Sequence, residues 1–248
     1  MHDALAHFAA HPWLAAIALV VVFAGAVVQF SLGMGFGLTV APVLAVIDPV
    51  LVPVPTLLMS LAVSALGAFR ERGAIVWPEA LTAAGGRLTG ALIAAVILGG
   101  LVASRDGFSL VFGCLILVAV VLSVAGLKLA FTRTNIYGMG VVSGIMATIT
   151  SVGAPPLAIV YQGQPARQAR PTLAATFTFG TIFSVSGLIL SGWAGWSDVW
   201  FALLLAPGTV AGYYAARALG PAMDARYRAF LLAISGMAGV VLVLRGLT

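Results

Sequence analysis

Residues 31–37 read SLGMGFG and interrupt an apolar, uncharged run that continues on both sides. Three glycines, Gly33, Gly35 and Gly37, alternate with bulkier residues, and Pro42 follows them closely. Glycine gives the backbone conformations that other residues rarely adopt, and a plain membrane helix gains nothing from three of them. The stretch therefore predicts a break between two helical segments inside an apolar region.

The composition lies far outside the range of soluble proteins. Hydrophobic residues make up 62% of the 248 and charged residues 8%, whereas soluble domains have about half and about a quarter. The formal net charge of +5 comes from basic residues scattered over short polar segments, which argues against nucleic-acid binding. We expect an all-α, polytopic integral membrane protein whose surroundings are the lipid bilayer.

Hydropathy divides the chain into two sets of five apolar segments, to be compared with the roughly 20 helical residues that cross a bilayer. The first set covers residues 13–31, 36–47, 50–69, 78–103 and 108–131, and the second covers residues 136–150, 154–161, 171–191, 197–219 and 230–244. The second segment of each set is too short to cross alone. We therefore expect broken or re-entrant helices there, at a depth where irregular backbone is tolerated only against protein or a watery cavity.

The two sets share landmarks at a nearly constant spacing. Gly33 and Gly153 are 120 positions apart, and the PTL tripeptides that begin at Pro55 and Pro171 are 116 apart. This common order predicts an internal duplication, with halves at residues 1–131 and 132–248. Membrane proteins built from two such halves are commonly transporters that bind their substrate where the halves meet.

Charge placement predicts how the two halves are oriented. If every apolar segment crosses once, nine basic loop residues lie on one side of the membrane, and Arg105 and Arg245 lie on the other. The positive-inside rule makes the richer side cytoplasmic, so the second half is expected to be inverted relative to the first. A topology with re-entrant short segments would scatter the charges and ranks second. The predicted cytoplasmic residues are Arg70, Arg72, Lys128, Arg133, Arg167, Arg170, Arg217, Arg226 and Arg228.

Arg87 lies deep within a predicted span. It follows Trp77, an expected interfacial residue, by ten positions, which at about 1.5 Å per residue places it roughly 15 Å into the membrane. A cation at that depth is costly unless it is paired or faces water, and the acidic residues all fall near span ends. We interpret Arg87 as an anion-binding residue. The alternative is a structural arginine that bonds backbone carbonyls or snorkels to the interface.

The helix breaks offer a second device for binding an anion. A helix that begins after Gly35 or Gly153 would point free N–H groups and a positive dipole end into the protein. The alternative is that the Gly-x-x-x-Gly segments pack helices and the hydroxyls bond their own helix. The predicted substrate-binding residues are Gln29, Ser31, Gly33, Gly35, Phe36, Gly37, Ser60, Arg87, Thr150, Ser151, Gly153, Ala154, Pro155, Pro156 and Thr176.

The sequence offers few candidate residues for catalysis or metal binding. The three histidines, His2, His7 and His11, precede the first span, and Cys114 is the single cysteine. We therefore expect no enzyme activity, metal or cofactor. Export of an anion needs no coupling ion, because a negative cell interior favours it by about 2.3 kcal/mol per charge per 100 mV. A passive anion channel and a membrane-embedded enzyme or assembly factor are the alternatives, and the Gly-x-x-x-Gly segments permit a homodimer.

Three motifs carry a resemblance to a known family. The block GMGFGLTVAPVL from Gly33, its degenerate copy SVGAPPLAIV from Ser151 and the PTL tripeptides resemble the sulfite exporter TauE/SafE family of membrane permeases. This resemblance implies transport of sulfite or an organosulfonate such as sulfoacetate across a bacterial inner membrane, with substrate near the glycine blocks. The matching positions are Gly33, Gly35, Gly37, Pro42, Gly153 and Pro156. Bulkier residues, Met34, Phe36, Ala154 and Pro155, stand where the family tends to have consecutive glycines.

Overall fold

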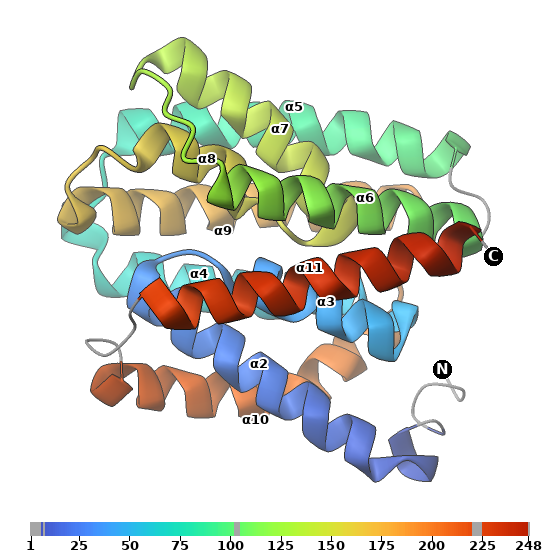
Figure 1. Cartoon of the computed structure of the whole chain (residues 1–248). Helices are drawn as coiled ribbons and strands as arrows, with labels where there is room; N and C mark the ends of the chain where they lie inside the picture. The colour runs from blue at the N-terminus through green and yellow to red at the C-terminus, as the bar shows by residue number, and fades with distance from the viewer. Residues whose placement is uncertain (1–5, 7, 102–104, 220–224, 248) are drawn as a thin grey trace.

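The computed structural model describes residues 6, 8–101, 105–219 and 225–247, and every regular element in these ranges is helical (Figure 1). The prediction of an all-α protein is confirmed, and seven helices of the described part are long and apolar enough to span a membrane. The first half contains α2 (Pro12–Leu32), α3 (Phe36–Ile47), α4 (Val54–Arg70), α5 (Trp77–Leu101) and α6 (Arg105–Val124), with 3-10 turns at Pro49–Leu51 and Arg72–Ala74. The second half contains α7 (Arg133–Thr150), α8 (Ala154–Tyr161), α9 (Ala166–Leu190), α10 (Trp196–Leu219) and α11 (Ala225–Leu247).

The ten predicted segments correspond to these ten helices. The two short helices, α3 and α8, have the predicted bounds. α6 ends at Val124, earlier than expected, and Gly126 beyond it has a left-handed φ of 62°, a conformation in which helices commonly end. α9 begins at Ala166, so Pro171 lies inside that helix instead of at its start.

Gly-x-x-x-Gly segments make close helix contacts within the chain. A Cβ on Gly86 would overlap the carbonyl oxygen of Tyr137 in α7, and one on Gly90 would overlap the carbonyl oxygen of Val141 in the same helix. A Cβ on Gly208 or Gly212 would lie 2.7 Å from a carbonyl oxygen of α2. Backbones approach this closely only where side chains are absent. These glycines therefore pack α5 on α7 and α10 on α2, and a homodimer stays a prediction.

The helix contacts match when each helix of the first half is paired with the helix in the same place of the second half. By this order α2 corresponds to α7, α3 to α8, α5 to α10 and α6 to α11. The contact of α5 with α7 then matches that of α10 with α2, and the contact of α11 with α3 matches that of α6 with α8. α4 packs on α9, and α6 lies along α11 (Figure 1). This matching is the pattern that two related units would give. The duplication and its inversion stay predictions, which this pattern favours.

Each half begins with a helical hairpin. α2 and α3 are antiparallel, and so are α7 and α8, whose outer ends meet where the Tyr161 ring lies edge-on to the Phe131 ring, 5.1 Å away. The first arms end at left-handed residues, Gly33 with φ 79° and Ser151 with φ 63°. Gly35 and Gly153 then begin the short returning arms. The equivalent glycines are therefore Gly35 and Gly153, two positions away from the pairing expected from sequence spacing.

Basic side chains gather at one end of the helices. Arg70 and Arg217 lie over the Tyr213 ring at 5.5 and 5.1 Å from its centroid, and Arg170 contacts Glu71 at the end of α4. At the opposite end, Arg245 donates to the carbonyl of Val46 at 2.9 Å. The side chains of Arg105, Arg226 and Arg228 lie outside the described residues. That the basic end faces the cytoplasm stays a prediction.

Candidate functional site

The turns of the two hairpins touch each other. A Cβ on Gly37, in the first turn of α3, would overlap the carbonyl oxygen of Ser151 and lie 2.9 Å from its carbonyl carbon. The Ser151 hydroxyl donates to the carbonyl of Pro53, just before α4, at 2.9 Å. The two breaks, which lie in different halves of the sequence, thus form one structural feature.

A small polar cavity lies beside this contact. Its volume is about 20 Å³, enough for a water molecule. Eight predicted residues line the cavity: Gln29, Gly35, Gly37, Ser60, Arg87, Ser151, Gly153 and Ala154. Five further lining residues were not predicted: Leu38, Leu57, Ala147, Phe177 and Thr181. We call this space the central cavity.

Arg87 supplies the positive charge of the central cavity. Its side chain is 1% exposed, and its Nη1 donates to the hydroxyl of Ser143 at 2.8 Å. That hydroxyl donates in turn to the carbonyl of Gly153 at 2.6 Å. The guanidinium carbon lies 5.3 Å from the centroid of the Phe177 ring. A Cβ on Gly180 would overlap Nε, so α9 leaves just enough room for the guanidinium.

The Arg87 guanidinium has an incomplete set of partners. Its Nε is buried without a hydrogen-bond partner, and within the described residues the single ion pair joins Arg170 to Glu71. The hydrogen bond of Nη1 goes to a serine hydroxyl, whereas the structural alternative expected bonds to backbone carbonyls. A buried cation without a nearby acid is costly, and a bound anion would offset that cost.

Gln29 makes hydrogen bonds on both sides of the first helix break. Its Nε2 donates to the carbonyl of Gly33 at 3.0 Å, and its Oε1 accepts from the N–H of Phe36 at 3.1 Å. The first N–H of α3 is therefore already bonded, while the next positions, Gly37 and Leu38, have no partner within the helix. α8 offers fewer donors, because two of its first residues are prolines.

Seven predicted residues lie outside the central cavity. The hydroxyls of Thr150 and Thr176 donate to carbonyls of their own helices at 2.7 and 2.9 Å, as the structural alternative expected. Phe36 is 1% exposed and packs in the apolar core. The other four are Ser31 and Pro155, which line a neighbouring cavity, Gly33, which lies under the Arg170 side chain, and Pro156, which is buried.

A larger cavity of about 760 Å³ leads from the basic end towards the central cavity. Glu71, Arg167 and Arg170 line its outer part, and Gly35 and Ala154 line both cavities. Met34, Leu122 and Leu173 contribute apolar wall. We call this space the vestibule; the bulk of Met34 thus lies in the vestibule and not in the central cavity.

Sequence reasoning missed Ser143, Phe177 and Thr181. Phe177 and Thr181 are four positions apart on α9, so they share one face of a helix that already carried a candidate, Thr176. That spacing indicates a shared face, but it does not indicate which way the face points. Ser143 offered no such signal, because its contact with Arg87 joins residues 56 positions apart.

Comparison with known proteins gives one match. The family model described as Sulfite exporter TauE/SafE matches residues 17–242, a range that contains the turns of both hairpins, Arg87 and the vestibule. No curated protein and no solved structure matches the chain.

Proposed function

Because the chain belongs to the sulfite exporter TauE/SafE family of membrane transporters, we propose that it exports a small sulfur-containing anion across the bacterial inner membrane. The proposed substrate is sulfite or an organosulfonate such as sulfoacetate. This proposal rests on the burial of Arg87: its guanidinium is fully buried where the two hairpins touch, and its Nε has no hydrogen-bond partner.

The chemistry of the central cavity suits such a substrate. A sulfonate keeps its charge at all ordinary pH values, so it can be held by N–H donors, hydroxyls and a guanidinium without proton transfer. Arg87, Ser60 and Thr181 supply a cation and two hydroxyls, and Gly37 supplies an N–H at the start of α3. Leu57 and Phe177 supply apolar wall, against which a short carbon chain would pack.

The two cavities suggest a route for the anion. The central cavity, at about 20 Å³, is too small for sulfite, so binding must move the hairpin turns apart. The vestibule reaches the central cavity from the basic end, which we place in the cytoplasm by the positive-inside rule. An anion would enter there, bind at Arg87 and leave on the other side as the two halves move relative to each other.

The test is flux of sulfite and sulfoacetate in proteoliposomes. We expect saturable flux for the wild type and a loss of at least about tenfold for Arg87→Ala, because one charge-assisted hydrogen bond contributes on this scale. Arg133→Ala, which removes an exposed arginine at the start of α7, is the matched control and should transport normally. Unchanged flux in Arg87→Ala would exclude the proposed site, and flux that does not saturate would indicate a channel.

A further inference from the structure

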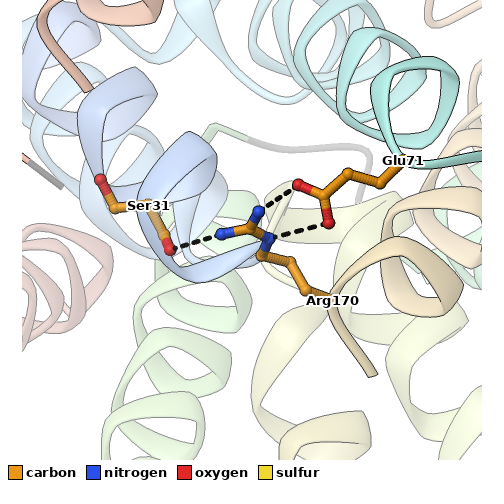
Figure 2. Close-up of polar contacts among 3 residues, drawn as sticks. All are labelled: Ser31, Glu71 and Arg170. Carbon is orange, nitrogen blue, oxygen red and sulfur yellow. Dashed lines mark hydrogen bonds and ion pairs between the residues drawn. The ribbon is translucent and has the colours of Figure 1, made fainter. Parts of the chain in front are cut away.

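The vestibule contains an ion pair at the turn of the first hairpin (Figure 2). Arg170 donates from Nε to Oε2 of Glu71 at 3.2 Å, and from Nη2 to Oε1 of the same carboxylate. Its third nitrogen, Nη1, donates to the carbonyl of Ser31 at 3.3 Å. Arg170 therefore joins the start of α9 to the end of α4 and the end of α2.

This ion pair lies on the path of an entering anion. Arg170 crosses the first hairpin at Gly33, where a Cβ would lie 3.0 Å from the Arg170 Cβ and would overlap its Cγ. Glu71 and Arg170 line the vestibule, whose inner wall includes Gly35 of the central cavity. An anion that enters the vestibule from the basic end therefore meets a wall that carries the Arg170 guanidinium.

The ionisable side chains along the vestibule leave one cation in excess. Arg167, Arg170 and Glu71 line it, and Arg167 is exposed one turn before Arg170 on the same helix. The Arg170 and Glu71 side chains are 38% and 30% exposed, so water and solutes reach both. A two-point bond to a carboxylate is also the geometry in which a guanidinium binds an oxyanion with two accessible oxygens.

We propose that Arg170 and Arg167 form a second anion site, where an oxyanion that enters the vestibule replaces Glu71 as the partner of Arg170. The ligand class is a small oxyanion such as sulfite or a sulfonate. This inference rests on the proposed export function for its biological meaning. The Glu71 carboxylate competes with the anion for Arg170, so the anion binds weakly. A weak first site lets the anion move on to Arg87.

The test measures equilibrium binding of sulfite to the full chain in detergent, in an Arg87→Ala background that removes the central site. Glu71→Gln should tighten sulfite binding about fivefold, the scale expected for releasing a part-exposed ion pair. Arg170→Gln should abolish the binding. Arg170→Lys should weaken it severalfold, because an ammonium keeps the charge and loses the two-point geometry. Asp48→Asn, which removes one negative charge outside the vestibule, is the control and should have no effect.

Two results would overturn the proposal: equal sulfite affinity with and without the Glu71 carboxylate, or sulfite binding that survives in both Arg170 variants. Thermal unfolding of each variant checks that it is folded, and the lysine variant gives a reading if the glutamine variant does not fold. Because Arg87 is absent throughout, a negative result here leaves the flux test of the central site unaffected.

A lipid phosphate offers the same chemistry as a free oxyanion, so the binding is repeated in nanodiscs. Neutral phosphatidylcholine discs are compared with discs that contain equal parts of phosphatidylcholine and phosphatidylglycerol. If the tighter binding of Glu71→Gln persists in both, the site takes a soluble anion. If phosphatidylglycerol removes it, the site belongs to a lipid headgroup and the proposal fails.

Discussion

Gly180→Ala is expected to disturb the Arg87 site without any change of charge. A Cβ at this position would overlap Arg87 Nε and lie 2.7 Å from Cζ, so the guanidinium must move by more than an ångström. Such a shift breaks the 2.8 Å bond from Nη1 to Ser143. A buried hydrogen bond from a charged group contributes about 1.5–3 kcal/mol, so sulfite binding should weaken roughly tenfold to a hundredfold.

The same helix provides a matched control. Gly187 lies two turns further along α9, and a Cβ there would be 3.6 Å from its nearest neighbour, which is ordinary van der Waals contact. Both substitutions replace a helical glycine with alanine, so any gain from helix propensity is common to them. Gly187→Ala should therefore bind sulfite like the wild type and unfold at the same temperature or slightly above it.

The assay combines sulfite binding in detergent with thermal unfolding of the same samples. If the clash is with the Arg87 side chain, removing that side chain should relieve it, so Gly180→Ala should destabilise the wild type more than it destabilises Arg87→Ala. Wild-type binding by Gly180→Ala, or an equal loss of stability in both backgrounds, would refute the placement of Arg87 against α9.

Two further predictions concern the hairpin contact and the partner of Arg87. Gly37→Ala places a Cβ onto the backbone of Ser151, which cannot rotate away, so the protein should lose about 1–3 kcal/mol of stability; thermal unfolding is compared with that of Gly73→Ala, where the space is open. Ser143→Ala removes the hydrogen-bond partner of Arg87, and sulfite binding measured by calorimetry should weaken about tenfold. An unchanged affinity in Ser143→Ala would mean that this bond does not position the guanidinium.

The helix breaks were predictable because their causes are local. Gly33 and Gly35 have φ values of 79° and 114°, which glycine adopts at low cost, and paired prolines mark the start of α8. Ser151 is the exception, since it takes a left-handed φ of 63° without being glycine. Its hydroxyl bond to Pro53 and its backbone bond to Ala147 hold it there, and neither is visible in a sequence pattern.

Whether a given hydroxyl faces the central cavity could not be predicted. Ser60 and Thr181 line the cavity, whereas Thr150 and Thr176 bond their own helices. All four are small polar residues near a helix break or a PTL segment, so the sequence offers the same signal for each. The rotation of the helix about its axis, which is set by packing against neighbours, decides which way each hydroxyl points.

The sequence by itself determined the membrane class, the helical composition, the two hairpin breaks and the place of Arg87 inside a long apolar helix. These features follow from the length of the apolar segments and from the positions of glycine and proline, which are properties of short stretches of sequence. Only the tertiary structure decided that Arg87 meets Ser143 and Gly180, and that Arg170 meets Glu71 across 99 positions. Contacts between such distant residues depend on how whole helices rotate and pack against each other, and no local pattern encodes that.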